Sequence, residues 1–161
     1  MAGRDFSATV GALLASCCVP PALRRVTTAA EPTIGDRLSA ALEAGAGDRS
    51  AMVRHAQHLY AAAQSSPDLD DAMLAGAEAW ARRAVGAGSP EGQYVLADIL
   101  LFRAGVALGW DDMAAACEFA TESLGLLDQL ADEGVEEAAA GIVVASAAMA
   151  ANGLHLEGAA K

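Results

Sequence analysis

The stretch that decides the fold is AEAWARRAVGAGSPEGQYVLADIL, residues 77–100. It joins the end of one predicted helix, which contains Trp80, to the start of another through the break Gly86-Ala87-Gly88. Ser89 and Pro90 then give a helix-start signal, a capping hydroxyl followed by proline at the first helical position. A helix end, a glycine break and a new helix start in such a short stretch indicate a junction between two helical hairpins.

A repeat emerges when the glycine breaks of the chain are aligned. Gly47, Gly88 and Gly134 are 41 and 46 residues apart, and such intervals are typical of helical repeat arrays. Four residues after each glycine comes a small residue, which lets two helices approach closely. Eight, nine and twelve residues after each glycine come residues that are mostly apolar. The small residues are Ala51, Gly92 and Ala138.

Caps and breaks predict six helices from Thr33 onward. Thr33 caps the first, which carries Ile34, Leu38, Ala41 and Leu42 on one face and ends at the glycines near residue 45. The others are expected over 48–64, from the acidic turn at 68–71 to 86, over 90–103, from 111 or 112 to 131, and over 136–151. Residues 104–110, with two glycines, are predicted to form a loop. A short helix over 5–18 is also possible, stopped by Pro20 and Pro21.

Composition supports an all-α domain and disfavours a nucleic-acid partner. The 161 residues are rich in alanine and poor in proline and aromatic residues, which favours helices. The formal net charge of −11 disfavours a nucleic-acid surface, because phosphate binding needs clustered positive charge. A solvated acidic surface is the simpler interpretation of that charge, and attraction to a basic partner is the alternative.

The central junction resembles the Sel1-like repeat family, a relative of the tetratricopeptide repeats. The residues that carry this resemblance, in the family's order, are Trp80, Ala84, Gly88, Gly92, Gln93, Tyr94, Leu96 and Ala97. The match is specific over about 40 residues and weaker over residues 38–152. This sequence departs from the family at its usual Gly-x-Gly-Val-x-x-Asp loop, which is degraded over 105–111, and at Leu126-Leu127, which replaces a Trp-Tyr pair.

The resemblance implies a right-handed αα-hairpin solenoid of about two and a half repeats over residues 33–152. Residues 1–32 would form an N-terminal extension and residues 153–161 a tail. Family members typically act as adaptors that hold a partner on a concave face, so a non-catalytic protein- or peptide-binding adaptor is expected. A secreted branch with paired cysteines is associated with β-lactam binding or hydrolysis, and a hydrolase of that kind is the alternative, although this chain lacks the cysteine pairs.

Helical periodicity predicts the binding groove. Positions four, eight and twelve after each glycine turn inward together, so positions six, ten and fourteen face away. This reasoning assigns to the free faces Val53, Gln57 and Ala61 on one helix, Tyr94, Asp98 and Phe102 on the next, and Arg54 beside them. The alternative is that Tyr94 and Phe102 are core residues. The groove candidates are therefore Arg54, Gln57, Tyr94, Asp98 and Phe102.

The last predicted helix suggests a second kind of contact. Its residues 138–151 contain a single polar side chain, Ser146, so the helix is apolar nearly all round and needs cover on several sides. Solenoid ends normally carry a polar cap. Self-association through Ile142, Val144 and Met149, which gives a homodimer, is one hypothesis, and cover by the N-terminal segment is the other.

Candidate chemical groups have simpler structural explanations. His55 and His58 share a helix face as some metal ligands do, but no third ligand follows, so half-buried histidines are expected. Asp68–Asp71 and Asp111-Asp112 lie at helix starts, where carboxylates cap free backbone N–H groups. No Gly-x-Ser-x-Gly turn occurs, and neither a metal nor a cofactor is predicted. Trp110 is expected to be either a core anchor or an exposed contact.

Cysteine usage bears on the compartment. Cys17, Cys18 and Cys117 form neither a pairing framework nor a metal-ligand spacing, which fits a reducing, cytoplasmic environment. No continuous apolar run of membrane-spanning length is visible. Residues 14–17 (LASC) also resemble the lipobox of bacterial lipoproteins. A periplasmic binding module acylated at Cys17 is therefore the alternative localisation, although Asp5 and interspersed polar residues weaken the signal.

Overall fold

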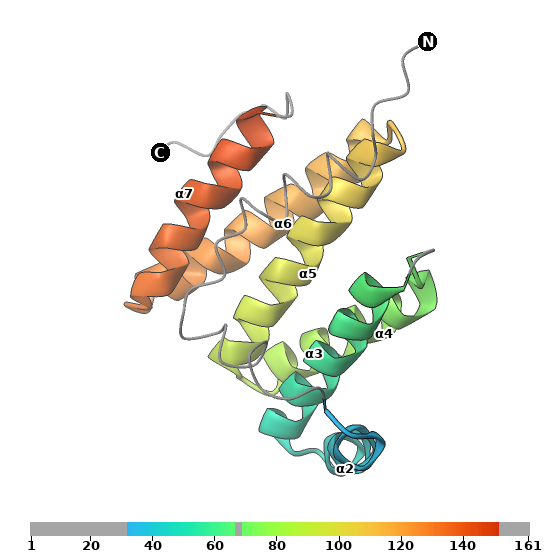
Figure 1. Cartoon of the computed structure of the whole chain (residues 1–161). Helices are drawn as coiled ribbons and strands as arrows, with labels where there is room; N and C mark the ends of the chain where they lie inside the picture. Colours follow the sequence, from blue (N-terminus) through green and yellow to red (C-terminus); the bar gives the residue numbers. More distant parts are fainter. Residues whose placement is uncertain (1–31, 67–68, 152–161) are drawn as a thin grey trace. The chain divides into compact units, whose positions relative to one another are not determined.

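The computed structural model describes residues 32–66 and 69–151, and within these ranges the chain is all helical (Figure 1). No strand occurs in these ranges. The helices are α2 (Ile34–Gly45), α3 (Arg49–Ser65), α4 (Asp71–Gly86), α5 (Pro90–Gly109), α6 (Met113–Asp132) and α7 (Glu136–Ala151). The prediction of an all-α protein with six helices after Thr33 is therefore confirmed for the described residues.

The helix starts are capped by the side chains that the sequence indicates. Thr33 Oγ1 accepts a hydrogen bond from Asp36 N at 3.2 Å, and Asp36 Oδ2 accepts one from Thr33 N at 2.9 Å, which completes a capping box. Asp48, Asp70 and Asp112 each accept from the backbone N–H three residues on, at 2.6, 3.0 and 3.0 Å. Ser89 Oγ accepts from Gly92 N at 3.0 Å. Capping thus explains Asp70 and Asp112 without further chemistry.

Four helix ends share one backbone arrangement. A 6→1 hydrogen bond closes each of them: from Asp48 N to Glu43 O, Ser89 N to Ala84 O, Asp112 N to Ala107 O and Val135 N to Leu130 O. The residue before each donor has a positive φ, as in a Schellman motif. That residue is Gly47, Gly88 and Gly134 at three ends and Asp111, with φ 59°, at the fourth.

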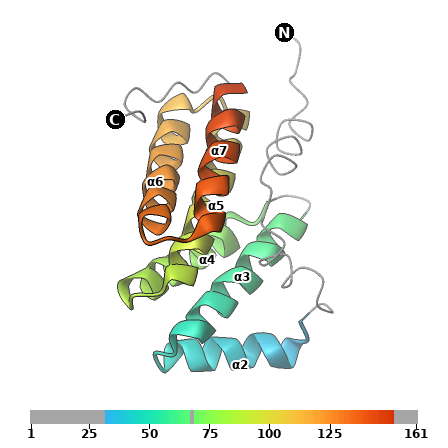
Figure 2. The ribbon, with the colours of Figure 1, turned by 90° about the vertical axis from the view of Figure 1, so that its left-hand side faces the viewer.

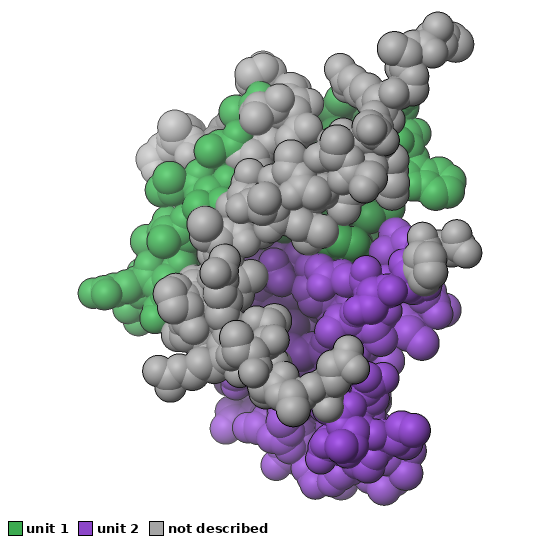
Figure 3. All heavy atoms as spheres, viewed as in Figure 1, with its two compact units in different colours: residues 1–20, 100–161 green, residues 21–99 purple. Residues whose placement is uncertain are grey.

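The chain divides into two compact units, which are described separately (Figure 3). Unit 2 comprises residues 21–99 and unit 1 comprises residues 1–20 with 100–161, so the boundary lies within α5. In unit 2, α3 packs extensively against α4 and also against α2, which lies at a steep angle to it (Figures 1 and 2). The fully buried side chains of unit 2 are mainly small: Ala44, Ala51, Ala56, Ala63, Ala77, Ala81 and Ala84.

Small residues permit the close helix contacts that the repeat predicts. A Cβ placed on Gly92 would lie 2.7 Å from Ala84 Cβ and 3.2 Å from both Ala84 C and Val85 N. Only glycine therefore fits at this contact between α4 and α5. Ala51 and Ala138, which likewise lie four residues after a glycine break, are also fully buried.

In unit 1, the C-terminal half of α5 forms a core with α6 and α7. The two later helices run side by side (Figures 1 and 2). The core residues are Leu101, Ala104, Ala116, Ala120, Leu124, Ala145 and Met149, with Ala107, Leu108, Cys117, Phe119 and Ile142 packed against them.

This core explains one correction to the sequence analysis. The predicted loop over 104–110 is wrong, since α5 continues to Gly109. Gly105 does not end the helix, because Ala104, Ala107 and Leu108 pack into the unit 1 core and tertiary packing outweighs the modest cost of glycine in a helix.

The expectations for the N-terminal helix over 5–18, the extension 1–32, acylation of Cys17, the pair Cys17-Cys18 and the tail 153–161 lie outside the described residues.

Candidate functional site

The predicted groove is not an open surface. Phe102 is only 8% exposed and Val53 1%, while Gln57, Tyr94 and Asp98 are half-buried. Arg54 alone among the five groove candidates is exposed, and its Nη2 pairs with Glu43 Oε2 at 2.8 Å. The helical-wheel argument failed for α5 because residues 95–97 and 99–102 are all buried, so this helix has no free face over those turns. Phe102 is therefore a core residue, as the alternative held.

Asp98 has a role that the spacing argument could not reveal. Its carboxylate accepts a hydrogen bond from the hydroxyl of Tyr60, a buried residue of α3. Burial raises the pKa of Asp98 to about 6, and the Tyr60 hydrogen bond offsets part of that rise. The pair ties α3 to α5 within unit 2 with a titratable group. Although Asp98 as a whole residue is half-buried, its carboxyl group is desolvated and bonded to Tyr60, so this group is not an exposed partner contact.

Trp80 is covered by two side chains of unit 2. The ring of His55 meets it edge-on, with centroids 5.2 Å apart, and the Arg83 guanidinium lies 4.3 Å from the centroid of the ring. Both contacts stabilise an aromatic residue that is half-buried. In the turn that follows α4, Ala87 O and Gly88 O accept hydrogen bonds from Arg49 Nη1 at 3.4 and 3.3 Å. Trp80 thus takes part in the packing between α3 and α4.

The two histidines of α3 are half-buried, as expected. Burial is the main cause that lowers the pKa of both, and for His58 the nearby Arg37 and His55 add to the effect. Their Nδ1 atoms are buried without a hydrogen-bond partner. Across residues 32–66 and 69–151, no three His, Cys, Asp or Glu side chains are grouped so as to hold a metal ion.

One face of α2 carries three large apolar side chains that are exposed to solvent. Ile34, Leu38 and Leu42 are 82%, 62% and 71% exposed, and they recur every fourth residue on one side of the helix. The opposite side packs on α3 through the buried Ala40 and Ala44. The sequence predicted this apolar stripe but not its direction, since the two alanines face the protein and the three large residues face outward.

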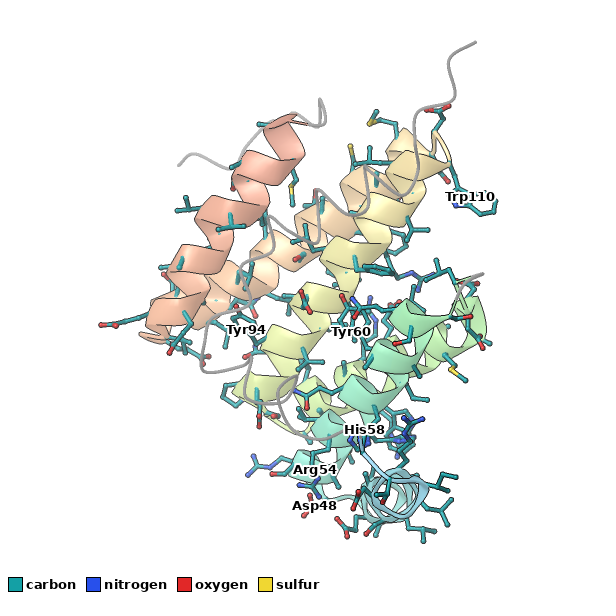
Figure 4. The ribbon with its side chains drawn as sticks, in the orientation of Figure 1. Asp48, Arg54, His58, Tyr60, Tyr94 and Trp110 are labelled. Atoms are coloured by element: carbon teal, nitrogen blue, oxygen red, sulfur yellow. The ribbon has the colours of Figure 1, made fainter. Side chains whose placement is uncertain are left out.

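The turn between α5 and α6 carries a second exposed apolar group. Trp110 is 77% and Met113 50% exposed, and Figure 4 shows Trp110 projecting from the end of α5. Of the two alternatives for Trp110, the exposed contact therefore agrees with the structure. The core anchor does not.

The predicted self-association residues divide between core and surface. Met149 is 3% exposed and belongs to the unit 1 core, Ile142 packs against that core, and Val144 is half-buried. The exposed large residue of α7 is instead Val143. Met149 is thus unavailable for an interface in this arrangement, and any contact through α7 would centre on Val143. Self-association itself stays a prediction.

Among the described helices, α5 alone is long and apolar enough to cross a membrane. Most of its apolar stretch is buried inside the protein, as is usual for the core helix of a helical domain.

Comparison with protein-family models, with curated proteins and with solved structures gives no significant match to this chain.

Proposed function

We propose that this chain is a non-catalytic adaptor that binds a protein or peptide partner, and that its helices form a Sel1-like solenoid. The observation that carries the binding role is the exposed stripe of α2, formed by Ile34, Leu38 and Leu42. Large aliphatic side chains at such spacing on a solvent-facing helix mark a site for another apolar surface. The partner that fits best is an amphipathic helix, which would lay its apolar face along the stripe.

The repeat assignment rests on backbone geometry at the glycine breaks. Gly47, Gly88 and Gly134 all adopt positive φ, and each break is closed by the same 6→1 hydrogen bond. A buried small residue follows four positions later in all three cases. Recurrence of the same junction supports a repeat array, and the apolar outer face of α2 then needs cover from another surface.

The test is a comparative pull-down with the full chain from cell extract. We expect Leu38→Ser/Leu42→Ser to lose specific partners that wild type retains, because the double substitution removes most of the apolar stripe. The matched control is Val143→Ser, which changes an exposed apolar residue of α7 and should retain them. Circular dichroism should give equal helicity for all three proteins. Identical partner sets for wild type and the α2 variant would contradict the proposal.

A further inference from the structure

The turn between α5 and α6 holds Trp110 in a fixed outward position. Three backbone hydrogen bonds close the turn: Trp110 N to Ala107 O at 3.0 Å, Asp111 N to Leu108 O at 3.2 Å and Asp112 N to Ala107 O at 2.9 Å. The Asp112 carboxylate also caps α6. A side chain presented by a rigid turn loses little backbone entropy on binding, which makes an exposed tryptophan an effective anchor.

Two other aromatic rings of this protein are each covered by an arginine guanidinium. The Arg83 guanidinium lies over Trp80 at 4.3 Å, and the Arg103 guanidinium lies over Phe119 at 4.8 Å. A cation placed over an aromatic ring is attracted by the ring's negative face. Within the part of the chain that the structure describes, Trp110 has no such cover. An arginine from another molecule would complete the same arrangement at Trp110.

The charge around the turn favours the same ligand. Asp111 follows Trp110 directly, is exposed, and forms no ion pair with any described residue. The chain as a whole carries a formal net charge of −11. This charge steers a basic partner toward the protein and disfavours a second copy of the chain, a nucleic acid or an anionic membrane.

We propose that Trp110, Asp111 and Met113 form a docking surface for an arginine-containing basic segment of a partner protein. One guanidinium stacks on the Trp110 indole and pairs with the Asp111 carboxylate, and an apolar residue of the same segment contacts Met113. The surface belongs to unit 1, whereas the α2 stripe belongs to unit 2. This inference therefore goes beyond the proposed function and does not depend on binding by α2.

The test uses the full chain and a fluorescein-labelled probe peptide, Gly-Arg-Leu-Arg-Gly-Arg-Gly, followed by fluorescence anisotropy at low salt. We expect saturable binding that weakens as salt is added, because ion pairing contributes to it. Trp110→Ala should weaken binding at least tenfold and Asp111→Asn about threefold. Both side chains are exposed, so neither change should reduce helicity in circular dichroism. A peptide with glutamate in place of each arginine is the matched control and should not bind.

Several results would overturn this inference. They are equal binding by wild type and Trp110→Ala, equal binding of the arginine and glutamate peptides, and no saturable binding at millimolar peptide. Concentration-dependent dimerisation abolished by Trp110→Ala would assign the surface to a second copy and would also overturn it. The Leu38→Ser/Leu42→Ser variant should bind the arginine peptide as wild type does, so failure here is distinguishable from failure of the α2 proposal.

Discussion

The two tryptophans of this protein lie within or directly after helices whose C-terminal ends share the same backbone closure, but the two side chains have opposite surroundings. The end of α4, beyond Trp80, is closed by the hydrogen bond from Ser89 N to Ala84 O at 3.0 Å, and the end of α5, at Trp110, by the one from Asp112 N to Ala107 O at 2.9 Å. Trp80 is covered by His55 and Arg83, whereas Trp110 is exposed. Local backbone geometry therefore does not decide whether a residue serves packing or contact. The neighbouring helices decide it.

The junction between α4 and α5, where the two helices pack closely at Gly92, should be sensitive to a single added methyl group. We expect Gly92→Ala to lower the free energy of unfolding by about 1–3 kcal/mol, because its Cβ would lie 2.7 Å from Ala84 Cβ and α4 and α5 would have to separate. Urea denaturation followed by circular dichroism measures this change.

The matched control for that prediction is Gly125→Ala in α6. A Cβ at this glycine would meet nothing within 4 Å, so we expect a gain of about 0.5–1 kcal/mol from improved helix propensity. Similar stabilities for the two variants would mean that α4 and α5 do not pack as closely at Gly92 as described.

The interior of unit 2 should also carry a distinct pH dependence. The pKa of Asp98 is raised from 3.8 to about 6 in the folded protein, so the folded state binds more protons than the unfolded state between these values. The contribution of Asp98 to stability is therefore greatest below pH 3.8 and is lost as pH rises through about 6. We expect Asp98→Asn to gain stability relative to wild type over this interval, by up to about 3 kcal/mol.

Chemical denaturation of both proteins at a series of pH values tests this sign. Half-buried His55 and His58 titrate in the opposite sense, since their lowered pKa values cost stability as pH falls. That contribution is common to both proteins and cancels in the difference. A difference between Asp98→Asn and wild type that is constant from pH 4 to 7 would show that the carboxyl is not buried.

Truncation of each tryptophan tests the comparison directly. Trp80→Ala should lower the free energy of unfolding by about 2–3 kcal/mol, because it removes the contacts with His55 and Arg83. Trp110→Ala should change it by less than about 0.5 kcal/mol, as is usual for exposed positions. Thermal or urea unfolding measures both. Equal losses would mean that Trp110 is covered in solution.

Small effects of opposite sign are expected at the left-handed residue of each turn. Asp111 adopts φ 59°, which glycine tolerates better than any L-residue, so Asp111→Gly should stabilise the protein by about 0.5 kcal/mol. The reverse change at the other junction, Gly88→Ala at φ 77°, should destabilise it by about 1 kcal/mol. Stability changes of the same sign in both variants would argue against a shared turn geometry.

The sequence by itself determined the local structure. Thr33, Asp70 and Asp112 cap their helices as predicted, Asp48 caps the helix that was predicted to start near it, and the glycine breaks lie at helix ends. These features depend on hydrogen bonds within a few residues along the chain, so the local sequence is sufficient to specify them.

Only the tertiary structure decided which faces are covered. It continued α5 through Gly105, buried Phe102, joined Asp98 to Tyr60 and turned the stripe of α2 outward. Helical periodicity gives the angle between side chains but not the direction in which a neighbouring helix lies. That direction depends on residues distant in the sequence, and so burial, and with it the candidate binding surfaces, could not be predicted from spacing alone.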